Sequence, residues 1–199
     1  MQTSTTRPAE IKVADTSDEA GVIGVLTLAF GSDPMARWSQ PDPAKYLTNF
    51  PLIAKAFGGG AFTKGTAYFG KEYSGAALWL PPGVEPDVET MIGLVEDTAS
   101  KEIKADRNGV FELMEKYHPK ESHWYLPMIG VDPSHQGNGV GSALMVEALK
   151  RVDDDKSIAY LESSNPRNIS LYKRHGFEVI GEIQVGTSPV MRPMLRKAQ

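Results

Sequence analysis

The sequence predicts one domain of mixed α and β structure, an α/β or α+β fold, with a strand–turn–helix–strand unit in its last third. Its 199 residues are enough for one domain with a sizeable core. The hydrophobic share of 41% and the charged share of 23% are typical of a globular domain. Apolar residues alternate in some segments and recur at helical spacing in others. We therefore expect residues 1–199 to form a single domain, with a flexible segment at residues 1–10.

The first 80 residues mix strand and helix signals. A first strand, Ile11–Ala14, is followed by a capping box at Thr16 and Glu19, and helical spacing continues to Phe30. Four prolines predict that residues 31–57 divide into short helices and turns. Beyond them we expect a glycine turn at 58–60 and short strands at 61–63, 67–70 and 76–80.

The rest of the chain continues this mixture. A helical region at 87–118 is expected to be interrupted near Gly109. The strand His123–Val131 contains Pro127, which cannot donate a ladder hydrogen bond. Pro127 therefore indicates a bulge or a place where the neighbouring strand parts from this one. Further helices are expected at 140–152 and 165–175, and further strands at 158–162, 177–184 and 190–195.

Composition excludes several functional classes. There is no cysteine, so disulfides, thiolate nucleophiles and thiolate metal sites are absent. The net charge of −4 argues against a nucleic-acid partner, and no apolar run is long enough to span a membrane. A polar start without an apolar signal region, together with the lack of cysteine, favours a cytoplasmic protein. The four histidines show no paired metal-ligand spacing, so no metal is expected.

Charge is unevenly distributed along the chain. Residues 81–121 hold 10 acidic and 5 basic side chains. One interpretation is a solvated helical surface, and the other is an acidic rim that attracts a cationic acceptor. The sequence leaves both interpretations open.

A glycine-rich turn, VDPSHQGNGVGSALM, joins the strand that ends at Val131 to the helix expected from Val140. A helix start carries free N–H groups and a positive dipole end, and glycines let an anion approach these groups closely. The turn lacks the Lys-Ser/Thr pair of a nucleoside triphosphate loop and the G-x-G-x-x-G spacing of a dinucleotide site. The glycines alone leave open a pyrophosphate cradle and a tight helix entry without a ligand.

Two motifs now carry a family resemblance. Gln136-x-x-Gly139-x-Gly141 resembles the Q/R-x-x-G-x-G/A signature of the GCN5-related N-acetyltransferase (GNAT) family. Downstream, ESSNPRNISLYKRHGFE at 162–178 resembles the second cofactor motif of that family. Two motifs in this order over about 55 residues are more specific than either alone. The HWYL and HQG-G-GS patterns are most similar to the puromycin N-acetyltransferase-like branch.

The resemblance implies the GNAT fold, a mixed and mostly antiparallel central sheet of six to seven strands flanked by helices. It also implies a V-shaped splay between the central strands, which would admit the pantetheine arm of acetyl-coenzyme A, the expected co-substrate. One freed backbone N–H would polarise the thioester carbonyl. The cofactor-binding residues that the resemblance implies are Met128, Ile129, Val131, Gln136, Gly137, Asn138, Gly139, Val140, Gly141, Ser142, Asn165 and Tyr172.

Two residues of the second motif have competing interpretations. Tyr172 matches the general acid of the family, which protonates the departing coenzyme A thiolate. The alternative for Tyr172 is a core tyrosine packed under Phe177. Asn165 matches the asparagine that contacts the pantetheine or acetyl region, and it also suits a helix cap.

The general base departs from the family pattern. Many relatives carry a glutamate on the strand before the glycine turn, and the corresponding position here holds Tyr125. Glu162, at the end of its strand beside the V, is the candidate base that would deprotonate an attacking ammonium. The alternatives are a water relay to another carboxylate and, for Glu162 itself, a solvated charge at a strand end.

These assignments predict an N-acyltransferase that moves an acetyl group from acetyl-coenzyme A directly to a primary amine of a small molecule, as a monomer or homodimer. A non-catalytic acyl-coenzyme A sensor on the same fold is the alternative, and a nucleotide-binding domain is a third interpretation. Trp38, Trp79 and Tyr125 are predicted to line an aromatic acceptor pocket, although each tryptophan also suits the core. No motif identifies the acceptor itself.

Overall fold

The computed structural model describes residues 9–96 and 101–199. The strands are β1 (Ile11–Ala14), β2 (Ala67–Gly70), β3 (Gly75–Leu80), β4 (His123–Val131), β5 (Ile158–Ser163), β6 (Glu178–Val179) and β7 (Arg192–Arg196). The helices are α1 (Glu19–Phe30), α2 (Pro34–Ser39), α3 (Pro43–Gly58), α4 (Gly60–Lys64), α5 (Val88–Glu96), α6 (Lys101–Tyr117), α7 (Val140–Asp154) and α8 (Ile169–Arg174). Short 3-10 turns occur at Lys71–Tyr73, Pro133–His135 and Pro166–Asn168.

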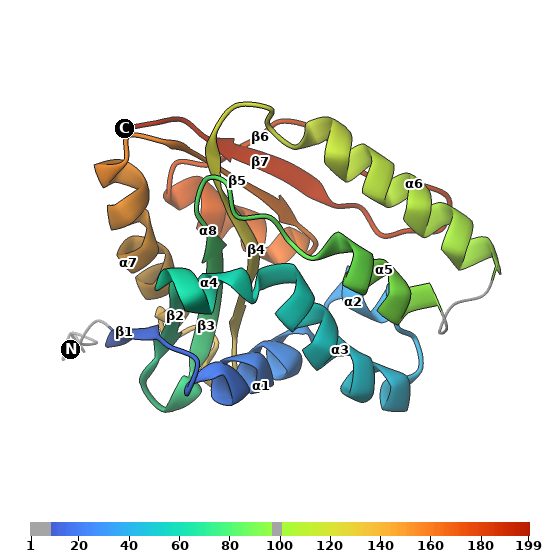
Figure 1. The fold of residues 1–199 in the computed structure, drawn as a ribbon, viewed down its shortest axis with the longest axis horizontal. Helices are drawn as coiled ribbons and strands as arrows, with labels where there is room; N and C mark the ends of the chain where they lie inside the picture. The colour runs from blue at the N-terminus through green and yellow to red at the C-terminus, as the bar shows by residue number, and fades with distance from the viewer. Residues whose placement is uncertain (1–8, 97–100) are drawn as a thin grey trace, which may run out of the picture.

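One mixed sheet organises the described residues (Figure 1). Its seven strands follow the order β1-β2-β3-β4-β5-β7-β6. Neighbouring strands are antiparallel except β4 and β5, which run parallel. The predicted mixed, mostly antiparallel sheet flanked by helices is therefore confirmed. Residues 1–8 of the segment predicted to be flexible lie outside the described residues.

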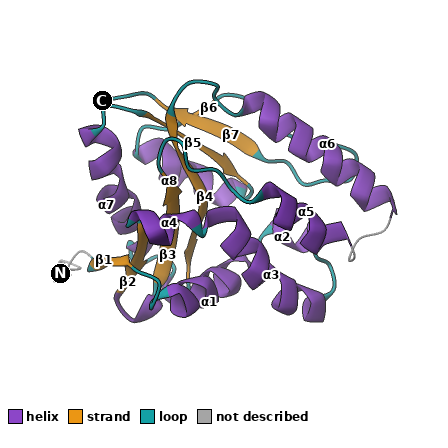
Figure 2. Ribbon diagram, viewed as in Figure 1, coloured by secondary structure: helices purple, strands orange, loops and turns teal. Residues whose placement is uncertain are grey.

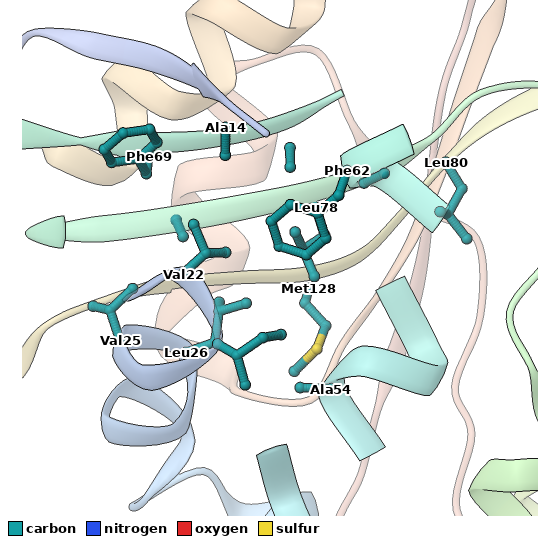
Figure 3. Close-up of a cluster of buried hydrophobic side chains, with 14 of the residues drawn as sticks. Ala14, Val22, Val25, Leu26, Ala54, Phe62, Phe69, Leu78, Leu80 and Met128 are labelled. Carbon is teal, nitrogen blue, oxygen red and sulfur yellow. The ribbon is translucent and has the colours of Figure 1, made fainter. Parts of the chain in front are cut away.

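Helices cover both faces of the sheet (Figure 2). On one face α1, α3 and α4 pack against Leu78 and Met128 of β3 and β4 (Figure 3). On the other face α7 and α8 pack against Trp79 and Trp124. Because side chains alternate across a strand, the neighbours Leu78 and Trp79 belong to different cores.

The parallel strands β4 and β5 separate part-way along their length. Their pairing runs from His123 opposite Ile158 to Tyr125 opposite Tyr160 and ends there, although both strands continue. The remaining β4 backbone faces no β5 partner within the described residues. This separation is the V-shaped splay that the family fold predicts.

A bulge in β4 accompanies the splay. Leu78 of β3 pairs with Met128 of β4, and Leu80 pairs with Tyr125. This step covers two residues along β3 and three along β4. Pro127 lies in this extra step, where its missing N–H does not interrupt a ladder hydrogen bond. The bulge predicted from Pro127 is confirmed.

The segment after α3 is more helical than predicted. The strand expected at 61–63 is wrong, because these residues belong to α4, where Ala61 and Phe62 are buried. The glycine turn expected at 58–60 is confirmed only at Gly59, because Gly58 ends α3 and Gly60 begins α4. A Cβ on Gly58 would lie 2.6 Å from Cδ1 of Leu78, so this glycine allows α3 to pack directly on β3.

The prolines act differently according to their place in a helix. Pro34 and Pro43 occupy the first positions of α2 and α3, each after an aspartate whose carboxylate accepts hydrogen bonds from first-turn N–H groups. Pro51 lies inside α3, which continues through it, so the predicted break there is wrong. The carbonyl that loses its donor belongs to Leu47, a residue that is 64% exposed, so water can satisfy it.

Two helix boundaries also differ from the prediction. α6 continues through Gly109, where a Cβ would lie 2.9 Å from Cγ1 of Val185. This glycine therefore permits close packing and does not end the helix. α1 begins at Glu19 without a side-chain cap, so the capping box predicted from Thr16 is wrong.

Candidate active site

A cavity of about 460 Å³ opens at the splay between β4 and β5. β4 contributes residues 126, 127 and 129–131, β5 contributes Leu161 and Glu162, and the α1–α2 segment contributes Asp33. The glycine turn and the starts of α7 and α8 complete the lining. Backbone groups of β4 that have lost their β5 partners need other hydrogen bonds, so an extended ligand with amide groups fits along this strand.

The glycine turn has the backbone shape of an anion site. Gly137 and Gly139 both have φ of +80°, a conformation that strains other residues, and a Cβ on either would meet nothing within 4 Å. α7 begins directly after Gly139 with no side-chain cap and no acidic residue in its first turn. The N–H groups at the start of this 15-residue helix therefore suit a phosphate group.

Two cationic side chains that the sequence analysis missed line the same cavity. Arg167 and Arg174 are exposed and lie within the second motif, where only Asn165 and Tyr172 were assigned. A guanidinium pairs well with phosphate oxygens, so both arginines complement the cradle. Their position in that motif is the signal that would have found them.

Ser142 joins the cradle to the end of α8. Its Oγ lies 2.9 Å from Nε2 of His175. Burial lowers the pKa of His175, and Arg174 and Arg196 lower it further. The ring is therefore neutral at pH 7 and adds no positive charge to the cradle.

Most of the predicted site residues lie together. Those that line the cavity are Ile129, Val131, Gln136, Gly137, Gly139, Val140, Gly141, Ser142, Glu162, Asn165 and Tyr172. Asn138 is exposed on the turn and does not line it. Met128 directs its side chain into the core beside α1 and α3, so only its backbone can take part (Figure 3). Oδ1 of Asn165 accepts a hydrogen bond from the N–H of Arg167, so this residue is both a cap and part of the lining.

Tyr172 lines the cavity from α8 and is only 5% exposed. Its ring also packs edge-on against Phe177, with centroids 6.3 Å apart, so the core and cavity interpretations hold together. Burial raises the pKa of the Tyr172 hydroxyl, and the charge of Asp33 acts in the same direction. Tyr172 is therefore protonated at neutral pH, as a proton donor must be.

Glu162 is buried and not solvated. Its side chain is 4% exposed, and Oε2 accepts a hydrogen bond of 2.8 Å from the Tyr125 hydroxyl. Oε1 has no hydrogen-bond partner among the described residues. Tyr125 occupies the position where many relatives carry a glutamate, so here β5 supplies the carboxylate and β4 supplies the hydroxyl that orients it.

Two phenols flank this carboxylate. The rings of Tyr125 and Tyr160 stack with centroids 6.0 Å apart. Burial raises the pKa of both hydroxyls, and the negative charge of Glu162 raises it further. Both tyrosines therefore keep their protons at neutral pH.

Asp33 is a second buried carboxylate that the sequence analysis missed. Oδ1 caps α2 through the N–H groups of Met35 and Ala36, and Oδ2 accepts a hydrogen bond of 2.7 Å from Oγ of Ser164. Burial raises the pKa of Asp33. Asp33 therefore connects the α1–α2 segment to the end of β5. The Asp33-Pro34 pair, which is typical of a helix start, is the sequence signal that would have identified it as a cap.

The residues of the predicted aromatic pocket do not line this cavity. Trp79 is fully buried on the α7 side of the sheet, whereas Tyr125 faces the α1 side. Nε1 of Trp38 donates a hydrogen bond to Oγ1 of Thr187. Tyr125 lines a second cavity of about 260 Å³. Strand alternation places the Trp79 and Tyr125 side chains on opposite faces of the sheet.

Metal and membrane sites were searched over residues 9–96 and 101–199. No group of three or more His, Asp or Glu side chains there could hold a metal ion. No helix in the same ranges combines the length and apolarity needed to cross a bilayer.

Comparison with known families decides the family question. A model described as "Acetyltransferase (GNAT) family" matches residues 71–177, more than half of the chain. The chain belongs to the GNAT acetyltransferase family. This GNAT chain is thus a member of an N-acetyltransferase enzyme family, whose co-substrate is acetyl-coenzyme A. The matched range contains the bulge, the splay, the glycine turn and Tyr172.

Individual relatives agree with the family. A structure described as histone acetyltransferase HPA2 and related acetyltransferase from Corynebacterium glutamicum is 26% identical, with a TM-score of 0.69 over 97% of this chain and 98% of that one. A variant agmatine N-acetyltransferase is 13% identical, with a TM-score of 0.67 over 96% and 100%, and shares the fold. Mycothiol acetyltransferase of Saccharomonospora viridis is 36% identical over 56 residues, which are 27% of this GNAT chain and 18% of that protein.

Proposed function

We propose that this GNAT enzyme transfers the acetyl group of acetyl-coenzyme A directly to a primary amine of a small molecule in a ternary complex. One observation carries the proposal. The cavity at the splay is lined by an uncapped glycine turn, a protonated phenol and a buried carboxylate whose Oε1 has no hydrogen-bond partner among the described residues. These are the groups that acyl transfer to an amine requires for donor binding, base and acid.

Donor binding is assigned to the backbone around the splay. The unpaired β4 groups near Met128, Ile129 and Val131 would bind the pantetheine amides, and the N–H groups of residues 136–142 would bind the pyrophosphate. Arg167 and Arg174 would add charge to the phosphates. Two observations support this fit. Beyond Tyr125, β4 pairs with β3 but has no β5 partner among the described residues, and a Cβ on Gly137 or Gly139 would meet nothing within 4 Å.

Chemistry is assigned to two side chains. Acetyl-coenzyme A supplies an activated thioester carbonyl and a thiolate leaving group. Oε1 of Glu162 accepts a proton from the incoming ammonium, which frees the nitrogen lone pair for attack. A β4 N–H stabilises the negative charge that develops on the carbonyl oxygen. The Tyr172 hydroxyl donates its proton to the departing sulfur.

The acceptor is proposed to be a small cationic amine. Asp33 and Glu162 both line the cavity, and an amine that arrives as an ammonium is attracted to carboxylates. The agmatine enzyme shares the fold and acts on an amine by its name. Within the family, the HWYL and HQG-G-GS patterns favour the puromycin N-acetyltransferase-like branch, without implying that acceptor.

Organisation and location are also proposals. One continuous sheet joins both cores, which supports a single domain over residues 1–199. The lack of cysteine supports a cytoplasmic location, and the proposed assembly is a monomer or homodimer.

The test is a screen for coenzyme A release with aliphatic polyamines, arylalkylamines, aminoglycosides, aminonucleosides and amino-acid N-termini. With the best acceptor, Glu162→Gln should lower kcat by about 10²-fold or more while the Kd of acetyl-coenzyme A stays within about twofold. Glu178→Gln, on the exposed strand β6, is the matched control and should keep the wild-type rate. Tight binding of acetyl-coenzyme A with no release from any amine would favour the sensor alternative.

A further inference from the structure

Two histidines lie behind the proposed base. Nδ1 of His118, at the end of α6, is 3.9 Å from Oε1 of Glu162. Nε2 of His118 is 2.9 Å from Nε2 of His123, the first residue of β4. Nδ1 of His123 is 2.7 Å from the backbone carbonyl oxygen of Glu121. A chain of polar atoms therefore runs from Oε1 of Glu162 through both histidines to the α6–β4 turn.

The last partner assigns the protons along this chain. The carbonyl of Glu121 can only accept, so His123 carries a proton on Nδ1 and, when neutral, offers a lone pair at Nε2. His118 then donates from its Nε2. Its Nδ1 lone pair is left facing Oε1 of Glu162, in the state needed to receive a proton from that oxygen.

The chain leads from a buried place to an accessible one. Glu162 is 4% exposed at its side chain, whereas the His118 side chain is 27% exposed. His118 and His123 both line the second cavity of about 260 Å³, and Glu162 lines the first. The ring of His118 is held edge-on between Tyr125 and Tyr160, with centroids 4.8 and 4.9 Å away.

We propose that His118 and His123 carry the proton released in each turnover from Glu162 to water in the second cavity. This relay rests on the proposed function. As the N–C bond forms and the C–S bond breaks, the ammonium nitrogen loses two protons. One of these protons reprotonates Tyr172, which has given its own proton to the departing sulfur. Glu162 holds the other and must lose it before the next turnover.

The transfer itself uses the observed contacts. The Oε1–Nδ1 distance of 3.9 Å exceeds a hydrogen bond, so the ring closes by about 1 Å or one water bridges the gap. His118 then becomes an imidazolium beside a carboxylate, and it shares its charge with His123 across their 2.9 Å contact. Water in the second cavity takes the proton.

Other titratable or charged groups surround the pair. They are Glu162 and Tyr160 on β5, Tyr125 on β4, Glu85 after β3, and Tyr117, Lys120 and Glu121 at the end of α6 and in the turn after it. The carboxylates outnumber the ammonium among them, so a transient positive charge on the histidines is tolerated.

The first test uses the best amine from the screen. His118→Gln and His123→Gln should each lower kcat about tenfold to a hundredfold, with KM for acetyl-coenzyme A within about twofold. The variant rates should rise with the concentration of imidazole buffer, because a dissolved base replaces the missing ring, whereas the wild-type rate should not. Lys150→Gln, at an exposed position of α7 outside both cavities, is the control and should behave as wild type. A merely structural loss would not respond to buffer.

The second test needs no substrate. Nitrogen-15 NMR of the histidines should show a proton on Nε2 of His118 and on Nδ1 of His123. The opposite tautomer of His118 overturns the relay. If the wild-type protein acetylates amines and both histidine variants keep its rate, the relay is overturned and the proposed function stands. The same holds if the variants lose rate and imidazole buffer does not restore it. If the wild-type protein releases coenzyme A with none of the amines tested, both the proposed function and the relay are overturned.

Discussion

At the scale of single residues, neighbouring groups decide what Glu162 can do. A carboxylate at a strand end is usually solvated, but the side chain of this one is buried. Oε2 accepts a hydrogen bond from Tyr125, and Oε1 has no hydrogen-bond partner among the described residues. Leaving a buried polar atom unpaired costs roughly 1–3 kcal/mol. An unpaired buried polar atom calls for an explanation, and the proposed role of Glu162 as a base supplies one.

Tyr172→Phe tests the proposed acid at the same scale. The variant keeps the packing against Phe177 but cannot donate a proton, so kcat should fall about 10²-fold. Acetyl-coenzyme A affinity should stay within about twofold, because the binding backbone is unchanged. Steady-state kinetics and calorimetry measure both quantities. Undiminished turnover would rule out Tyr172 as the acid.

At the scale of elements, the start of α7 is shaped by backbone conformation. Gly139 takes φ of +80° directly before the helix, and residues 139–142, which include the start of α7, line the cavity. An L side chain is strained in that region by roughly 1–2 kcal/mol. The same residue therefore sets both helix geometry and the proposed phosphate site.

Gly139→Ala should raise the Kd of acetyl-coenzyme A about tenfold or more, because a relaxed turn no longer aims its N–H groups at the phosphates. Gly65→Ala is the matched control. Gly65 has φ of +62° and would place its Cβ 4.0 Å from Arg151, away from both cavities. Both variants should lose about 1 kcal/mol of stability, and only Gly139→Ala should lose affinity. Calorimetry and urea denaturation separate the two effects, and equal losses of affinity would contradict the assignment.

At the scale of the whole molecule, one buried arginine joins the elements of the site. Arg196 of β7 donates hydrogen bonds of 2.6 and 3.1 Å to the carboxylate of Asp153 on α7 and one of 3.0 Å to the carbonyl of His175 after α8. Its side chain is 4% exposed. The helix at the proposed phosphate site and the helix that carries Tyr172 are thus both bonded to the same strand.

Arg196→Met should lower the free energy of unfolding by about 2–3 kcal/mol, because three charge-assisted hydrogen bonds are lost while Asp153 can rehydrate. Lys150→Met removes an ion pair on the exposed side of α7 and should cost less than about 0.5 kcal/mol. Urea denaturation measures both. A loss for Arg196→Met as small as that of the control would contradict this account.

Buried phenols make the molecule sensitive to alkali. Burial raises the pKa of Tyr46, Tyr125, Tyr160 and Tyr172. A pKa that is higher in the folded state contributes stability that is full below the unfolded value, about 10, and is lost as pH rises through the folded value. The urea midpoint should therefore fall from pH 9 to pH 11. Tyr160→Phe, which removes a hydroxyl without a hydrogen-bond partner among the described residues, should make that fall shallower. A flat profile would contradict the prediction.

Features that depend on a few adjacent residues were predictable from the sequence. The bulge at Pro127 follows from a missing donor, and the turn at Gly139 follows from a backbone conformation open to glycine. Features that depend on a packing partner from a distant part of the chain were not predictable from the sequence. Gly58 and Gly109 were assigned to turns or breaks, but each makes room for a side chain from a distant segment.

The sequence by itself determined the strand–turn–helix unit and the second motif, and hence where the acyl donor is proposed to bind, because those rules act within a few residues of backbone. Only the tertiary structure decided that Trp79 faces away from Tyr125 and that Glu162 is a buried carboxylate held by a tyrosine 37 positions earlier in the chain. It also brought His118 beside that carboxylate. The protonation chemistry of a side chain depends on burial and on partners across the sheet, which no local pattern specifies.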